Sequence, residues 1–222
     1  MEHIRQKLTS ILDANSFLEL WPQLHTYNFM DFYQYGTKLE NAHQISNEKE
    51  SVITGIGKIS QRRCMIIAFE PLFIMGTLGV VAGEKIARAF QLAKKKRLPV
   101  ISIIASGGAR MQEGVFSLMQ MVKTSNAIVE HSSSGLLSIS IICDPTLGGV
   151  TASFASLADI IIGEKGSRFG FTGKKIIENT THEKLPDNFQ RVEYAQRHGQ
   201  VDIIAEKDEL RRLLIKILEL HR

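Results

Sequence analysis

Two adjacent glycines between a buried strand and a helix constrain this chain more than any other feature. The segment 99–104 is short, apolar and rich in β-branched residues, and Pro99 introduces it, which is typical of a buried strand. Gly107 and Gly108 follow, and the segment from about 113 to 131 then has apolar residues at helical spacing. The glycines therefore lie where a strand ends and a helix begins.

Such a junction favours the binding of negative charge. At the start of a helix, free backbone N–H groups point outward and the helix dipole is positive. Gly107 and Gly108 lack the Cβ atoms that would keep a ligand away from this backbone. The junction suits an anion, or an oxygen that becomes one during a reaction. Ser106 precedes the glycines, but no sequence pattern supplies it with a base, so we interpret it as a turn residue.

A second junction of the same kind occurs in the stretch ICDPTLGGVTASFAS. A strand ends at Asp144 and Pro145, and Gly148 and Gly149 open a segment of small residues that allows close helix packing. Each turn alone is also compatible with a plain strand-to-helix turn that needs glycine for a positive φ. Two such turns, one strand–helix unit apart, favour a shared site. Nucleotide-binding turns use similar glycines, although no Walker motif is present.

The order of predicted elements indicates an α/β fold with mostly parallel strands, because strands and helices alternate. We expect one domain over 1–222, with a helical and wrapping segment at 1–50 and a core with C-terminal helices at 51–222. The predicted strands are 52–59, 63–69, 99–104, 136–142, 159–163, 167–170 and 201–205. The predicted helices are 4–15, 79–97, 113–131, 148–157, 173–180, 187–198 and one beginning near 207.

Composition excludes several classes of protein. The N-terminus has no secretory signal and no apolar run is long enough to span a membrane, so we expect a cytoplasmic protein. The two cysteines, Cys64 and Cys143, lie in apolar strands; we interpret them as buried thiols, and they cannot form a zinc site. The net charge of +4 is mildly basic, but its densest cluster, 94–97, ends a helix and has no interleaved aromatic residues. Nucleic acid is therefore an unlikely partner.

Four charged residues lie near the junctions. The sequence leaves the role of one of them undecided and favours roles at helix ends for the other three. Arg110 could bind phosphate or form a local ion pair. Glu113 is placed where the dipole of the following helix favours a carboxylate. Asp144 and Asp159 follow strands, and helix capping is a more probable role for each than catalysis. No H-E-x-x-H or G-x-S-x-G motif is present.

Four segments resemble the carboxyltransferase β subunit of bacterial and plastid acetyl-CoA carboxylase. They are SGGARMQEGVFSLMQMVKTSNAI, DPTLGGVTASFASLADIIIGE, RFGFTGKKIIENT and EKLPDNFQRVEYAQRHGQVDIIA. The resemblance covers nearly the whole chain. It implies a crotonase-like fold (ClpP/crotonase), a spiral of repeated ββα units. It also implies transfer of a carboxyl group from carboxybiotin, on a biotin carboxyl carrier protein, to acetyl-CoA, which gives malonyl-CoA.

The resemblance also implies roles for residues. It places an oxyanion hole for the thioester enolate at Gly148 and Gly149. The residues implied in binding acyl-CoA are Ser106, Gly107, Gly108, Ala109, Arg110 and Leu147. Biotin itself would act as the base, and a second oxyanion hole would lie in a carboxyltransferase α subunit, in an α2β2 heterotetramer. This chain would then carry half of a site.

Three departures from the family pattern stand out. The zinc ribbon with four cysteines that usually precedes this region is missing, so we expect no zinc. Leu147 stands where relatives often have Met or an aromatic residue, and Lys174 and Lys175 replace Pro-Arg. These differences suggest a specialised paralogue, for example in secondary metabolism such as antibiotic biosynthesis, or one that tolerates an inhibitor. A malonyl-CoA decarboxylating subunit and a non-catalytic subunit remain alternatives.

Overall fold

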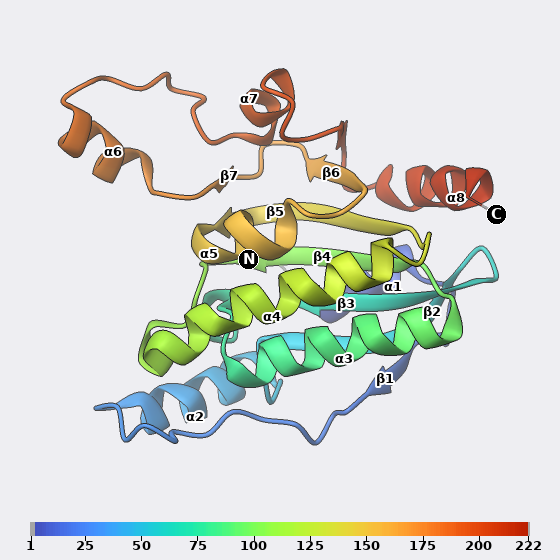
Figure 1. The fold of residues 1–222 in the computed structure, drawn as a ribbon, viewed down its shortest axis with the longest axis horizontal. Coiled ribbons are helices and arrows are strands. Elements are labelled where there is room, and N and C mark those ends of the chain that lie inside the picture. Colours follow the sequence, from blue (N-terminus) through green and yellow to red (C-terminus); the bar gives the residue numbers. More distant parts are fainter. Residues whose placement is uncertain (1–2, 222) are drawn as a thin grey trace.

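A single mixed sheet runs through the molecule and carries its strands in nearly the order of the sequence (Figure 1). The computed structural model describes residues 3–221. The strands are β1 (Leu18–Leu20), β2 (Val52–Ile59), β3 (Arg62–Phe69), β4 (Val100–Ser106), β5 (Ser138–Leu147), β6 (Ile160–Glu164), β7 (Phe169–Gly170) and β8 (Ile203–Ala205). The order is β1-β2-β3-β4-β5-β6-β8, with β7 paired to β5. The pairs β1–β2 and β2–β3 are antiparallel and the others are parallel.

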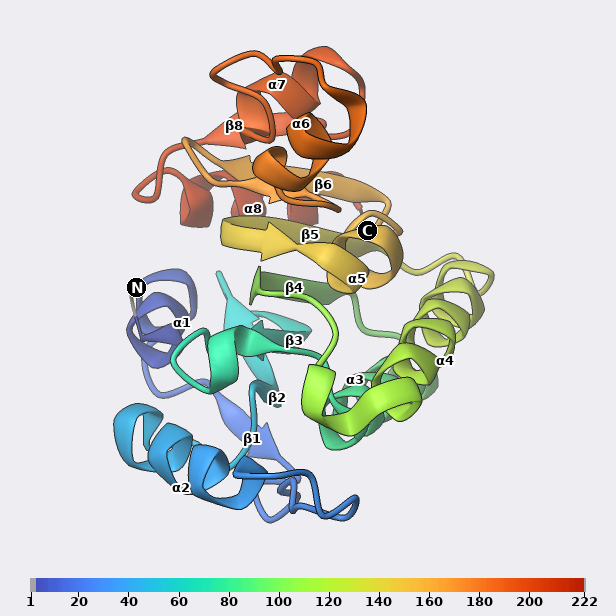
Figure 2. The ribbon, with the colours of Figure 1, turned by 90° about the vertical axis from the view of Figure 1, so that its left-hand side faces the viewer.

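Helices cover both faces of this sheet (Figure 2). They are α1 (Ile4–Ile11), α2 (Tyr35–Ser46), α3 (Val80–Lys96), α4 (Gly114–Ser132), α5 (Gly148–Val150), α6 (Lys174–Thr181), α7 (Val192–Arg197) and α8 (Leu210–Leu220). Helices α3 and α4 lie side by side on one face, and α1 and α8 pack on the other. Parallel strands covered on both faces must be apolar throughout, which explains the continuous apolar runs in the sequence.

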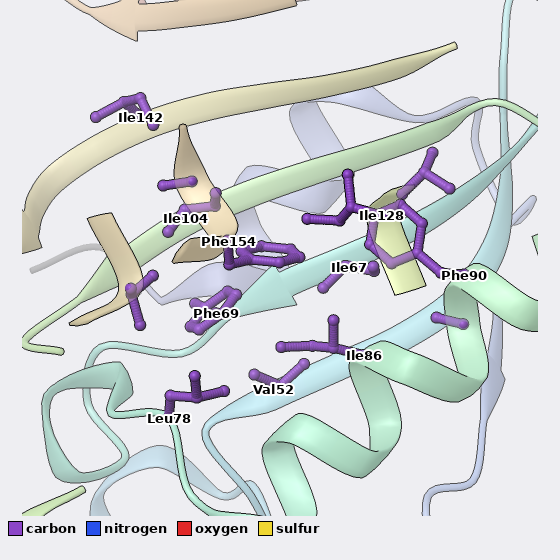
Figure 3. Close-up of a cluster of buried hydrophobic side chains, with 14 of the residues drawn as sticks. Val52, Ile67, Phe69, Leu78, Ile86, Phe90, Ile104, Ile128, Ile142 and Phe154 are labelled. Carbon is purple, nitrogen blue, oxygen red and sulfur yellow. The ribbon is translucent and has the colours of Figure 1, made fainter. Parts of the chain in front are cut away.

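Aromatic rings pack against one another in the core beneath α3 and α4 (Figure 3). The Phe154 ring centroid lies 5.6 Å from that of Phe69 and 6.2 Å from that of Phe90. All three side chains are buried, and burying each one contributes about 1.5–3 kcal/mol. This packing joins α3, β3 and the segment that follows the second glycine pair into one unit.

The second core lies between the sheet and helices α1 and α8. It contains the buried thiols of Cys64 and Cys143, as the sequence predicted. Burial raises the pKa of the Cys64 thiol to about 12, so this thiol stays protonated at neutral pH.

Most predicted elements are present, with three differences. The sequence did not predict α2 or the edge strand β1, both inside the segment expected to wrap. The helix expected at 148–157 is one α-turn followed by a π-helical turn, Thr151–Ala155. The helix expected at 187–198 begins only at Val192. Within residues 3–221, no helix is long and apolar enough to cross a membrane.

Candidate active site

The two glycine turns meet at the ends of neighbouring strands. Strands β4 and β5 are parallel, and Ser106 pairs with Thr146, so both strands end at the same edge of the sheet. Gly108 has a φ of +109° and Gly148 a φ of +63°. A Cβ on Gly108 would lie 3.3 Å from the Cα of Gly148 and 3.3 Å from the backbone nitrogen of Gly149. The tertiary structure therefore places the two turns in contact.

The first turn is closed by its own hydrogen bonds. The Gly107 N–H donates to the Met75 carbonyl at 2.8 Å, and the Gly108 N–H donates to the Ser106 hydroxyl at 3.1 Å. Ser106 is fully buried, which fits its interpretation as a turn residue. Both glycine N–H groups are thus occupied, one by the segment before β4 and one within the turn.

Leu78 holds the backbone on both sides of Ala109. The Leu78 N–H donates to the Gly108 carbonyl at 2.8 Å, and the Arg110 N–H donates to the Leu78 carbonyl at 2.9 Å. The Ala109 N–H between them has no acceptor among residues 3–221. An N–H group fixed in this way is a preorganised donor for a ligand oxygen.

The second turn supplies another free donor. The Gly148 N–H donates to the Phe171 carbonyl at 3.1 Å and so continues the pairing of β5 with β7. Gly149 lies in the first turn of α5, where N–H groups lack intrahelical acceptors, and no acceptor for it occurs in the described part of the chain. A Cβ on Gly149 would lie 3.6 Å from the Cβ of Ala109. The N–H groups without an acceptor that lie near each other are therefore those of Gly149 and Ala109, one from each turn, whereas the resemblance implied Gly148 and Gly149 as the pair, and that implied oxyanion hole stays a prediction.

Hydroxyl groups stabilise the irregular helix after Gly149. The Ser153 hydroxyl donates to the Gly149 carbonyl at 2.7 Å, and the Thr151 hydroxyl donates to the Thr146 carbonyl at 3.0 Å. π-helical turns are rare and occur frequently at functional sites. The small polar residues that the sequence indicated as close-packing thus also satisfy the backbone of the turn.

Arg110 does not reach the surface. Its side chain is 0% exposed and forms ion pairs with Glu50 and Glu113. Of its two predicted roles, the structure therefore shows the local ion pair, and its implied part in binding acyl-CoA stays a prediction. The side chain of Leu147 is half-buried and its carbonyl lies 3.3 Å from the Cβ position of Gly108, so its role as a pocket wall stays a prediction.

The three nearby carboxylates have roles other than those expected. Glu113 accepts a hydrogen bond at 2.5 Å from the N–H of Val80, so it caps α3 instead of its own helix. Asp144 accepts two hydrogen bonds from the Arg168 guanidinium, at 2.8 and 2.9 Å, which lower the pKa of its carboxyl. Asp159 accepts from the N–H and the hydroxyl of Ser138, each at 2.7 Å. Both aspartates thus join strands and loops and cap no helix.

Two further predictions concern a metal site and the Lys-Lys pair at 174 and 175. No group of three His, Cys, Asp or Glu residues within 3–221 is arranged to hold a metal ion. The Lys174 ammonium donates to the Pro186 carbonyl at 3.0 Å, and the side chain of Lys175 lies outside the described part of the structure. The suggestion of a specialised paralogue stays a prediction.

Comparison with known proteins agrees with this geometry. The Carboxyl transferase domain family matches residues 2–219. The chain belongs to this family. Among its relatives is the acetyl-coenzyme A carboxylase carboxyl transferase subunit beta of Desulforamulus reducens, which is 47% identical over 217 residues, 98% of this chain and 75% of the relative.

Two solved structures share the fold. The transcarboxylase 12S structure with methylmalonyl-coenzyme A and methylmalonic acid bound has a TM-score of 0.83 at 26% identity, over 98% of this chain and 41% of that one. A Pseudomonas malonate decarboxylase hetero-tetramer has a TM-score of 0.80 at 22% identity, over 99% of this chain and 82% of that one, which shows the fold alone. The predicted crotonase-like fold and the resemblance to a carboxyltransferase β subunit are therefore confirmed, and the chain is a transferase by family.

Sequence reasoning missed two parts of this site. It did not identify Ala109 as a donor in its own right, because an alanine after two glycines carries no chemical signal. It also gave no role to Tyr35 and Glu50, whose side chains reach Glu113 and Arg110. Neither residue lies in a periodic pattern that would have placed it under the glycine turn.

Proposed function

We propose that this chain is the β-type carboxyltransferase subunit of an acetyl-CoA carboxylase. It would transfer a carboxyl group from carboxybiotin, on a separate biotin carboxyl carrier protein, to acetyl-CoA and so form malonyl-CoA. The observation that carries the proposal is the pair of free donors, Ala109 and Gly149, at the point where the two glycine turns meet. The names of the relatives that match nearly the whole chain support the same reaction.

In this proposal the two donors bind the thioester oxygen of acetyl-CoA. When a proton leaves the methyl carbon, negative charge develops on that oxygen, and two fixed N–H groups stabilise it. The enolate carbon then forms the new bond to the carboxyl carbon that carboxybiotin supplies, the bond between that carbon and the biotin ring nitrogen breaks, and the biotin released carries the proton taken from the methyl carbon. Removing one such donor typically lowers the rate by about a hundredfold or more.

The proton is proposed to leave to a base outside this chain. The carboxylates closest beneath the first turn, Glu50 and Glu113, are fully buried and paired with Arg110. The sequence likewise showed no obvious catalytic His or Glu. The arrangement therefore fits a subunit that supplies the oxyanion site and receives its base with the second substrate.

A cavity next to the second turn offers room for the acyl-CoA. It has a volume of about 510 Å³, and its walls include Phe169, Phe171 and Ile176. Phe171, in the cavity wall, is also the residue whose carbonyl accepts the Gly148 N–H, so one residue links the cavity to the second turn. We propose that its apolar walls receive the pantetheine arm, since ligand pockets are mostly apolar with a few fixed polar groups.

The exposed face of α4 has the features of a binding surface for a partner subunit. Five apolar side chains on or just before this helix are 54–75% exposed and recur at the spacing of one helix face; they are Met111, Val115, Leu118, Met119 and Val122. A contiguous apolar stripe on a helix indicates a binding surface. Because α4 begins directly after the first turn, a subunit bound there would stand beside the acyl site. We propose that this subunit is the carboxyltransferase α subunit, with the α2β2 stoichiometry expected from the family resemblance.

A malonyl-CoA decarboxylating subunit is the second candidate. The structural likeness to malonate decarboxylase concerns the fold, whereas identity to β subunits of acetyl-CoA carboxylase extends over almost the whole chain. The deciding experiment is to purify the chain with an α subunit from the same genome and to supply malonyl-CoA with or without a free biotin derivative. We expect acetyl-CoA formation that depends on both the α subunit and the biotin derivative. Acetyl-CoA formation without biotin would instead identify a decarboxylase, and turnover by the chain alone would contradict the half-site.

A further inference from the structure

A buried polar cluster lies directly beneath the first glycine turn. Its centre is the guanidinium of Arg110, between the carboxylates of Glu50 and Glu113, and all three side chains are 0% exposed. The remaining members share hydrogen bonds with these three and come from four separate parts of the chain; they are Thr26, Tyr35, Ser51, Thr77 and Val80. Buried charges are tolerated only when paired and hydrogen-bonded, so a cluster of this size has a defined geometry.

The guanidinium of Arg110 uses both of its terminal nitrogens. Nη1 donates to Oε1 of Glu113 at 3.1 Å. Nη2 donates to Oε1 of Glu50, to the Ser51 hydroxyl at 2.9 Å and to the Thr77 carbonyl at 2.9 Å. Burial raises the pKa of the Glu50 carboxyl and the neighbouring Arg110 lowers it. The guanidinium prevails and holds this pKa below its ordinary value. The fork of an arginine can satisfy this set, whereas a lysine cannot.

The N-terminal segment supplies two members that reach across the chain. The Tyr35 hydroxyl donates to Oε1 of Glu113 at 2.7 Å and accepts from Nη1 of Arg110 at 3.3 Å. The Thr26 hydroxyl donates to Glu50 and accepts from the same Nη1 at 3.1 Å. Helix α2 and the loop before it are therefore tied to the glycine turn through side chains, not through the sheet.

The cluster acts on the backbone that holds Ala109. It binds the segment 77–80 at both ends, through the Thr77 carbonyl and through the Val80 N–H, which donates to Glu113 at 2.5 Å. Leu78, between these ends, makes the two hydrogen bonds that fix the residues on either side of Ala109. Gly79 leaves the space for this contact, since a Cβ there would lie 2.8 Å from Nη1 of Arg110 and 2.7 Å from Oε1 of Glu113.

We propose that Arg110 is a positioning residue for the Ala109 N–H, and that the segment 26–50 sets its position through Glu50 and Tyr35. The inference rests on the proposed function, in which the Ala109 N–H binds the thioester oxygen. It assigns the N-terminal segment a part in the chemical step, although Tyr35 and Glu50 bond to Glu113 and Arg110 and not to the donors. A group displaced by about 1 Å can lower a rate by a hundredfold, so small changes in the cluster are transmitted to turnover.

The test uses Tyr35→Phe in the complex with the α subunit, with Tyr33→Phe as the matched control. Tyr33 is 81% exposed, and the same hydroxyl is removed two residues away. The assay is carboxyl transfer from malonyl-CoA to a free biotin derivative, well below the melting temperature of each variant. For Tyr35→Phe we expect kcat to fall about tenfold while KM for malonyl-CoA stays within about twofold, because a displaced donor affects the transition state more than binding. Tyr33→Phe should match the wild type in both constants.

The kinetic constants of further variants and the rates of amide exchange separate a positioning role from a merely structural one. Glu50→Gln keeps the shape of the cluster and removes one charge, and we expect the same split between kcat and KM. Arg110→Lys should lower kcat more than Tyr35→Phe does, whereas Arg88→Lys, at the exposed ion pair with Glu84, should leave it unchanged. Amide exchange at Leu78 and Arg110 should be faster in Tyr35→Phe than in Tyr33→Phe, since these N–H groups hold the turn.

The outcomes that overturn the inference are distinct from those that overturn the function. If the wild-type complex is active and the Tyr35→Phe and Glu50→Gln complexes keep its kcat, the positioning role alone is overturned. This holds even if both variants melt at a lower temperature. Faster amide exchange with unchanged kcat would do the same and leave the cluster a packing feature. A wild-type complex that transfers no carboxyl group would overturn the proposed function, and the inference with it.

Discussion

Gly108 and Gly148 lie back to back where strands β4 and β5 end. A Cβ on either residue would lie 3.3 Å from the Cα of the other, and both residues have a positive φ. The two turns can approach this closely only because neither carries a side chain. The same approach brings the free N–H groups of Ala109 and Gly149 to one place, so the packing of two glycines and the candidate oxyanion site have a single cause.

Gly108→Ala is expected to lower the stability of the folded protein. The substitution adds a Cβ at a φ of +109° and against the second turn, and we expect a loss of about 1–3 kcal/mol in the free energy of unfolding. Gly166→Ala is the control, because Gly166 has a φ of +77° and open space around its Cβ position. Denaturant unfolding of both variants isolates the effect of the contact. Equal losses would show that the two turns do not constrain each other.

Gly149→Val is expected to act on the chemical step. Gly149 has no positive φ, but a Cβ there would meet the sulfur of Met121 at 2.8 Å and displace the donor or the acyl group. We expect kcat to fall by about a hundredfold or more, in line with the loss of one oxyanion donor. Thermal unfolding and kcat should be measured on the same sample. A well-folded variant that still binds its α subunit and keeps wild-type kcat would remove Gly149 from the site.

Leu118→Lys is expected to prevent binding of the partner subunit. It places a charge in the middle of the exposed apolar stripe of α4, where burial without a partner group is unfavourable. The matched control is Leu220→Lys, the same substitution at an exposed leucine of α8. Size-exclusion chromatography with the α subunit should show a complex for the control and none for Leu118→Lys, with similar melting temperatures for the two chains alone. Normal assembly by both variants would place the interface elsewhere.

His131 is expected to make the fold less stable below neutral pH. Its Nε2 donates to the Leu98 carbonyl at 3.0 Å, its Nδ1 has no partner within residues 3–221, and burial lowers its pKa despite an opposing effect of Asp159. The unfolded chain therefore takes up this proton at a higher pH than the folded one. The neutral ring contributes fully to the free energy of unfolding above the unfolded pKa of about 6.5. As the pH falls below that value, this contribution is lost by up to about 1.4 kcal/mol per pH unit.

The variant His131→Gln tests this pH dependence. Glutamine can still donate to the Leu98 carbonyl but does not titrate, so the free energy of unfolding should change less between pH 7.5 and 5.5 than in the wild type. The other histidines remain in both proteins and cancel in the comparison. An equal change in both would show that His131 becomes protonated without cost in the folded state.

The sequence by itself determined the elements around the site. The apolar runs and the glycine pairs placed β4, β5 and the two turns correctly, because strand and helix periodicity and the need for glycine at a tight turn are local properties. The buried cysteines and the turn role of Ser106 followed from the same local signals. The four segments that resemble a carboxyltransferase β subunit also led to the family, which the comparisons confirmed.

Only the tertiary structure decided which groups are free to act. The Gly148 N–H is occupied because β7, more than twenty residues later, brings the Phe171 carbonyl to it. The Arg110 guanidinium is buried because Glu50, 60 residues away in the sequence, pairs with it. The partner of each hydrogen bond is set by which distant segments pack together, and periodicity reports only which face of an element is buried. For this reason the sequence located the turns, and only the fold showed that the N–H groups of Ala109 and Gly149 have no acceptor within residues 3–221.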